Sequence, residues 1–148
     1  MVSFKKLYSL IFFLILFFIS NGNTSNLKGM KSYTLDKKDT EINATLKKPF
    51  SVKIESNRTT GFMWFLNSSN ENILKNLNLD KQNSSKDYIQ SNPSCKDCPL
   101  MVGVPGYDVF KFLPIKTGKI QLEFFYKQPW MKDTPSSYNK TLIVNIHE

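Results

Sequence analysis

Apolar and polar residues alternate with a period of two along several short stretches of this chain. A strand that is buried on one face produces this pattern, and no helical periodicity persists for long beside it. The alternation predicts strands over residues 30–35, 50–54, 62–66, 110–114, 120–126 and 142–146. Six or seven short strands separated by turns predict an all-β fold, an antiparallel β-sandwich.

Three further segments are expected to connect these strands. Residues 70–79 carry apolar side chains at helical spacing, which predicts one or two turns of helix. Residues 80–93 are polar and predict a loop, with a possible short edge strand at Tyr88 and Ile89. Residues 117–119 read Thr-Gly-Lys between two alternating stretches, which predicts a hairpin whose glycine takes a positive φ.

The N-terminal segment has the order of features that is typical of a secretory signal peptide. Two lysines precede an apolar run over residues 7–19, and small or polar residues follow it. The run is too short for a comfortable transmembrane span, which needs about 20 residues, so an uncleaved signal anchor is the less favoured alternative. We predict a signal peptide over residues 1–22 and one domain over residues 23–148.

A signal peptide implies that the mature protein is secreted or kept in a lysosome-like compartment, with no membrane attachment. Six Asn-x-Ser/Thr sequons give this route weak support. Removing the two lysines of the signal lowers the formal net charge from +8 to +6, because no acidic residue is lost with them. The remaining lysines are scattered, which indicates a solvated surface and not a nucleic-acid footprint.

The residue types that catalysis and metal binding need are scarce. His147 is the only histidine and lies one residue from the C-terminus, which is a poor place for a catalytic constellation. Cys95 and Cys98 have the spacing of metal ligands, but a second pair of ligands is missing. We expect them to form a local disulfide in an oxidising compartment, with a redox or metal role as the alternative. These observations favour binding over catalysis, without a cofactor or a metal.

Three loops carry residues that suit a binding surface. The loop that contains Gly103 and Gly106 is rich in glycine, which permits close approach of the backbone. The loop that ends at Trp130 offers a large tryptophan, a common hot-spot residue. Because alternate loops of a sandwich emerge at the same end, we expect the three loops to lie side by side. In chain order they are Asn57-Arg58-Thr59-Thr60-Gly61-Phe62, Gly103-Val104-Pro105-Gly106 and Gln128-Pro129-Trp130.

In these loops the sequence resembles the chagasin-type inhibitors of papain-like cysteine proteases. That family carries an Asn-Pro-Thr-Thr-Gly loop, a Gly-rich loop and an Arg-Pro-Trp loop, in the same order, on an immunoglobulin-like sandwich. The resemblance spans essentially the whole predicted domain, although only the three loops are specific. It implies a monomeric protein that is not an enzyme and that inhibits papain-like proteases, such as cathepsin L- or B-like ones, tightly and reversibly.

The resemblance also implies a mechanism in which the loops enter the active-site cleft of the protease as a wedge. The tip formed by Thr59, Thr60 and Gly61 would lie over the catalytic cysteine. The loop from Gly103 would run along the non-primed side, and Trp130 would pack on the primed side. The strand that begins at Phe62 would hold the tip firm from the core.

Two residues depart from the family pattern. Arg58 stands where the family usually has proline, so we expect a tip that is less constrained, because proline would fix φ. Arg58 also completes a sequon at Asn57, and a glycan there would obstruct the wedge. Gln128 stands where the family usually has arginine, so a forked cation is lost. The alternatives are that Trp130 only plugs the end of the sandwich, and that the protein is a secreted adhesion or carbohydrate-binding module.

Overall fold

The computed structural model describes residues 29–37, 39–67, 70–91, 103–131, 136 and 138–148. The predicted signal peptide and the predicted disulfide between Cys95 and Cys98 lie outside these residues. Within them the chain forms nine strands, one 3₁₀ turn and no α-helix. In chain order these elements are β1 (Lys31–Thr34), β2 (Asp39–Thr45), β3 (Phe50–Ser56), η1 (Arg58–Thr60), β4 (Met63–Leu66), β5 (Leu74–Asn76), β6 (Asp87–Gln90), β7 (Gly106–Pro114), β8 (Gly118–Lys127) and β9 (Tyr138–His147).

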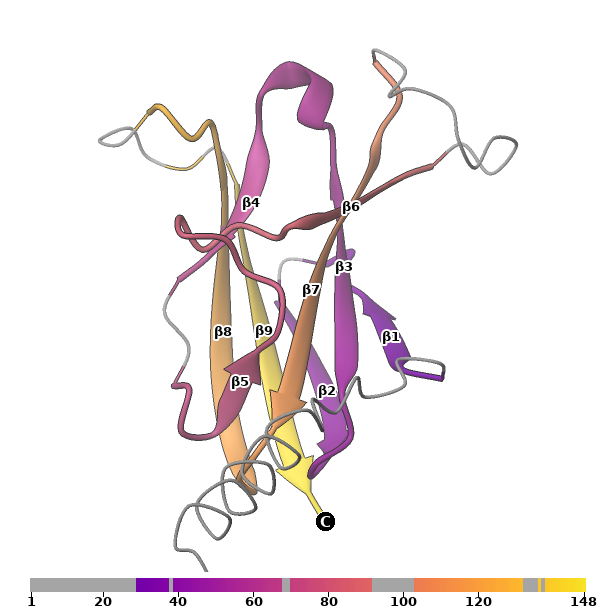
Figure 1. Ribbon diagram of the computed structural model, residues 1–148, viewed down its shortest axis with the longest axis vertical. Helices are drawn as coiled ribbons and strands as arrows, with labels where there is room; N and C mark the ends of the chain where they lie inside the picture. Colours follow the sequence, from indigo (N-terminus) through magenta and orange to yellow (C-terminus); the bar gives the residue numbers. More distant parts are fainter. Residues whose placement is uncertain (1–28, 38, 68–69, 92–102, 132–135, 137) are drawn as a thin grey trace, which may run out of the picture.

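The strands form two sheets, which confirms the predicted immunoglobulin-like sandwich (Figure 1). One sheet has the order β1-β3-β7, with β5 and β6 both paired to β7, and the other has the order β2-β9-β8-β4. Two pairs, β1 with β3 and β2 with β9, are parallel, and the other pairs are antiparallel. The first parallel pair arises because β2, which lies between β1 and β3 in the chain, belongs to the other sheet. The chain reverses at each crossing, so β1 and β3 run in the same direction.

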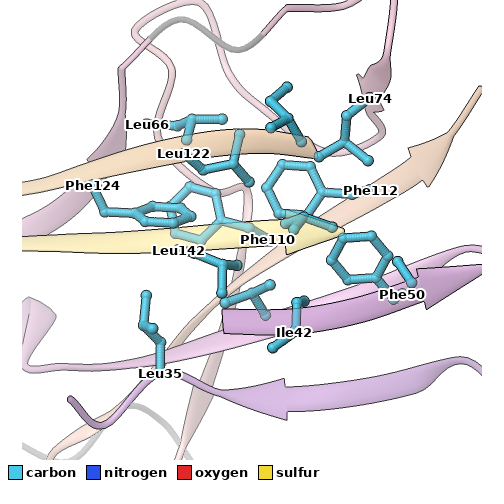
Figure 2. Packing of buried hydrophobic residues seen from close by; sticks show 14 of the residues in the cluster. Leu35, Ile42, Phe50, Leu66, Leu74, Phe110, Phe112, Leu122, Phe124 and Leu142 are labelled. Carbon is cyan, nitrogen blue, oxygen red and sulfur yellow. The ribbon is translucent and has the colours of Figure 1, made fainter. Parts of the chain in front are cut away.

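The apolar positions of the alternating stretches face one another and form the core (Figure 2). Phe110 and Phe112 of β7 are fully buried. The ring of Phe110 meets that of Phe124 at a centroid distance of 5.0 Å, and the ring of Phe112 lies 5.5 Å from that of Phe50. Burying a phenylalanine of this kind stabilises the fold by about 1.5–3 kcal/mol. The pair of Phe110 with Phe124 joins the two sheets, whereas Phe112 and Phe50 are cross-strand partners within one sheet.

The prediction of helix over residues 70–79 is wrong. Leu74–Asn76 forms β5, which pairs with β7, and Leu74 is fully buried in the core. Leu77, which the helical spacing assigned to the same face, is 41% exposed. A few apolar residues cannot stabilise a short helix by themselves, whereas the edge of β7 supplies backbone partners for an extended segment.

The predicted hairpin at residues 117–119 is also wrong, because β7 and β8 belong to different sheets and the connection crosses between them. The glycine in this turn, Gly118, does take the positive φ that was expected. The edge strand expected at Tyr88 and Ile89 is confirmed as β6. The sequence analysis missed β2, where only Ile42 and Ala44 alternate with polar residues and the apolar signal is weak.

The same end of the sandwich carries the connection from β3 to β4, the start of β7 and the end of β8 (Figure 1). The strand register gives the same arrangement. Ser56 at the end of β3 pairs with Gly106 at the start of β7, and Met63 at the start of β4 pairs with Lys127 at the end of β8. This end lies opposite the C-terminus (Figure 1). We call it the loop end.

Candidate functional site

The first loop, residues 57–61, forms a closed 3₁₀ turn at the loop end. The side-chain oxygen of Asn57 accepts hydrogen bonds from the Thr59 amide at 3.3 Å and from the Thr59 hydroxyl at 2.6 Å. The Asn57 carbonyl accepts from the Thr60 amide at 3.1 Å, and the Gly61 amide donates to the Arg58 carbonyl at 3.0 Å. Gly61 ends the turn in the left-handed region with φ of 79°, which glycine adopts without strain. The turn is therefore bonded within itself, and it presents Thr59 and Thr60 to solvent.

Aromatic residues support this turn from below. The hydroxyl of Tyr126 accepts a hydrogen bond from the Asn57 amide at 3.0 Å. The Tyr126 ring stacks on Phe62 at 5.4 Å and lies 5.0 Å from Trp64, measured between ring centroids. Trp64 is only 3% exposed, and its indole nitrogen donates to the Glu55 carbonyl at 2.8 Å. The strand was expected to begin at Phe62 and to hold the tip from the core. Trp64 provides this anchor, whereas Phe62 precedes β4 and is only half-buried.

Arg58 points away from the tip and into the sandwich. Its Nε donates to Oδ1 of Asp108 at 2.6 Å, and its Nη2 donates to the Ser85 carbonyl at 2.6 Å. Asp108 is fully buried, and its other oxygen accepts from the Trp64 amide at 3.0 Å. Burial raises the pKa of the Asp108 carboxyl, and the bonds from Trp64 and Arg58 offset part of this rise. The first loop is thus fastened to β7 by an ion pair whose carboxylate is fully buried.

The structure brings the three loops into direct contact. The Gly103 amide of the second loop donates to the Thr59 hydroxyl at 3.1 Å. The side-chain amide of Gln128, in the third loop, donates to the Thr60 carbonyl at 3.2 Å. Gly61 lies so close to the third loop that a Cβ on it would stand 2.6 Å from the Trp130 ring. The exposed tips therefore form one continuous surface.

The predicted site residues differ in how far this surface exposes them. Trp130 is 66% exposed, so it does not plug the end of the sandwich. Pro105 is exposed, whereas Val104 and Pro129 are half-buried. Gly106 is buried as the first residue of β7, and a Cβ on it would stand 2.5 Å from the Ile89 carbonyl. Packing against β6 therefore requires Gly106 to be glycine.

The sequence analysis missed four residues that hold the loops in place: Asp108, Ser85, Tyr88 and Tyr126. The alternation of β7 could have identified Asp108 from the sequence. Asp108 lies two residues before Phe110 and continues its alternation, so its position faces the core. A lone carboxylate at a core position needs a buried cation or several donors, and the pattern alone does not say that Arg58 supplies one.

A cleft of about 490 Å³ lies beside the first loop. Its walls include Trp64, Tyr126 and Tyr138, together with Glu55 and Lys140. Tyr138 is 68% exposed, whereas Trp64 is buried. Among the described residues no cluster of His, Cys, Asp and Glu could hold a metal ion, and no helix is long and apolar enough to span a membrane.

Residues 43–146, which include all three loops, match the sequence model of the chagasin family peptidase inhibitor I42. The chain belongs to the chagasin family of peptidase inhibitors. Members of this family inhibit proteases and are not enzymes, in agreement with the scarcity of catalytic residues. No curated protein matches the chain.

Several solved structures, including the following two, are similar to this fold. The cysteine protease inhibitor EhICP2 from Entamoeba histolytica superposes with a TM-score of 0.60 at 18% identity, covering 80% of this chain and 96% of that chain. Amebosin superposes with a TM-score of 0.55 at 24% identity, covering 80% of this chain and 98% of that chain. At these identities the likeness shows the shared sandwich fold.

Proposed function

We propose that this protein is a tight, reversible inhibitor of papain-like cysteine proteases, and that its three loops enter the active-site cleft as a wedge. The observation that carries the proposal is the continuity of the three tips. The bonds from Gly103 to Thr59 and from Gln128 to Thr60 join three separate segments into one surface. Membership of the chagasin family supports protease inhibition as the activity of that surface.

The geometry of the first loop explains why the wedge would block the protease without being cut. A substrate presents an extended peptide, whose amides pair with the enzyme as an added strand. In the tip, the amides of Thr60 and Gly61 are already bonded within the turn. Over the catalytic cysteine, this turn would fill the cleft without offering an extended scissile bond.

The other two loops would extend the contact to both sides of the catalytic cysteine. The loop from Gly103 to Gly106 would run along the non-primed side. Trp130 offers a large exposed ring for an aromatic surface on the primed side, and tryptophan is among the commonest hot-spot residues. Because the tips are already bonded to one another, little entropy should be lost on binding, which favours tight inhibition.

The proposal extends to the setting in which the inhibitor works. It acts as a monomer on cathepsin L- or B-like proteases, and it is secreted or kept in a lysosome-like compartment. The side chain of Asn57 is half-buried and its oxygen caps the turn. A glycan on this side chain would stand beside the tip, so the active form carries an unmodified Asn57.

Titration of papain with the purified protein tests the proposal. Activity should reach zero near one equivalent of inhibitor, return on dilution, and leave the inhibitor chain intact by mass spectrometry. Steady cleavage between Thr59 and Gly61 would show a substrate instead. Failure to inhibit at any ratio would favour the adhesion or carbohydrate-binding alternative.

A further inference from the structure

The carboxylate of Asp108 holds the first loop from both of its ends. One oxygen pairs with the Arg58 guanidinium, with Nη2 at 2.5 Å, and Arg58 precedes the tip. The other oxygen accepts the backbone amide of Trp64, which follows the tip. A single buried side chain of β7 therefore fixes the distance between the entrance and the exit of the turn.

The guanidinium of Arg58 also reaches the base of the second loop. Its Nη2 donates to the Ser85 carbonyl, just before β6, and its Cζ lies 5.1 Å from the ring centroid of Tyr88 in β6. Tyr88 in turn packs against Gly106, where a Cβ would stand 2.5 Å from the Tyr88 hydroxyl oxygen. Arg58 thus connects the first loop to the strand from which the second loop emerges.

We propose that Arg58, paired with the buried Asp108, is a positioning residue that holds the first loop and the base of the second loop in their binding conformation. Arg58 fastens the turn by an ion pair where the family's proline would do so by fixing φ. This inference rests on the proposed function, because it names the residues that set the shape of the same wedge. Arg58 acts through other residues, since its side chain is only 22% exposed and its Nε and Nη2 donate inside the protein.

The substitution Asp108→Asn separates positioning from direct contact, because Asp108 is fully buried and lies out of reach of any protease. Asparagine keeps an acceptor for the Trp64 amide but removes the charge that holds Arg58. We expect amide hydrogen exchange at Thr60 and Gly61 to become roughly tenfold faster or more, through local opening. Inhibition of papain should weaken roughly 10- to 100-fold, because each residue that must be ordered on binding costs about tenfold.

The double substitution Arg58→Pro with Asp108→Asn is the rescue. Position 58 begins the 3₁₀ turn, where proline is tolerated and its fixed φ suits the turn. This variant should recover slow exchange at the tip and most of the inhibition, although it has neither member of the ion pair. Arg58→Ala with Asp108→Asn, which lacks both the pair and the proline, should stay fast in exchange and weak in inhibition.

The outcomes separate this inference from the proposed function. If the unmodified protein does not inhibit papain, the proposed function fails, and exchange at Thr60 and Gly61 still decides the role of Arg58. If Asp108→Asn folds and keeps both slow exchange and full inhibition, the inference is wrong. If Asp108→Asn does not fold, Arg58→Lys replaces it, since lysine keeps the charge but loses the fork that bonds Asp108 and Ser85 together. Unchanged exchange at the tip of that variant would overturn the inference.

Discussion

In the middle of the sandwich, side chains such as Phe110 and Phe124 pack only against other apolar groups, and the alternation of the strands is enough to place them. At the loop end, the same two strands carry Asp108 and Tyr126, and their polar bonds to Arg58 and Asn57 of the first loop decide which segments meet. The apolar middle depends on burying enough volume in the right register. The loop end depends on particular partners that are far apart in the chain, so a single substitution there can change the shape of the surface without unfolding the protein.

The two tryptophans give the largest contrast between these regions. Trp64 is 3% exposed and lies between the core and the first loop. Trp64→Ala should lower the free energy of unfolding by roughly 3–5 kcal/mol, because it leaves a cavity under the loop. Chemical denaturation measures this loss, and a change near the 0.5 kcal/mol of an ordinary surface site would contradict the assignment of Trp64 to the core.

Trp130→Ala should act on the complex and not on the fold. Its side chain is 66% exposed, so the free energy of unfolding should change by no more than about 0.5 kcal/mol. Loss of a hot-spot ring should cost roughly 2–4 kcal/mol of binding, or about 30- to 1,000-fold in affinity for papain. Denaturation and inhibition are measured side by side with Trp64→Ala. If Trp130→Ala leaves both quantities unchanged, the third loop carries no binding energy.

Gly61→Ala sharpens the contrast within the loop end itself. Alanine in the left-handed region costs roughly 1–2 kcal/mol, and its Cβ would stand 2.6 Å from the Trp130 ring and displace it. We expect a modest loss of stability together with weaker inhibition of papain. Gly118→Ala is the matched control, because Gly118 also has positive φ but a Cβ there meets nothing within 4 Å. Gly118→Ala should lose stability and keep full inhibition of papain. If Gly61→Ala inhibits papain as well as Gly118→Ala does, Trp130 need not be held by the first loop.

The smallest effect concerns a salt bridge between β6 and β7 and its dependence on pH. A hydrogen bond from Lys111, whose Nζ lies 2.5 Å from the carboxylate, lowers the pKa of Asp87. A carboxyl whose folded pKa is depressed adds stability above its unfolded pKa of about 3.9, and this stability is lost as pH falls through the folded value. Asp87→Asn should therefore remove at most about 0.5 kcal/mol at neutral pH, because the pair is partly exposed, and less at pH 2. A larger loss at pH 2 than at pH 7, from denaturation curves, would contradict this sign.

The contrast also explains how much the sequence could predict. Burial sets the alternation of the long strands, so the sandwich and its core could be predicted. Leu74–Asn76 could not, because pairing with the edge of β7 decided its conformation. The three loops could be selected from their residue types, together with the exposure of Trp130. The pairing of Arg58 with Asp108, 50 positions apart, could not be predicted, because no local pattern specifies which buried charge meets which partner.

Protection of the catalytic cysteine of papain tests the wedge most directly. The rate at which iodoacetamide alkylates this thiol is measured with and without a saturating amount of the inhibitor. If the tip lies over the cysteine, the thiol of bound papain should not be alkylated. The remaining alkylation should come only from the small fraction of papain that has no inhibitor bound. Trp130→Ala at the same concentration should restore alkylation in proportion to its weaker binding. If the inhibitor stops substrate cleavage while the thiol is alkylated at the uninhibited rate, the loops bind outside the active-site cleft and the wedge is wrong.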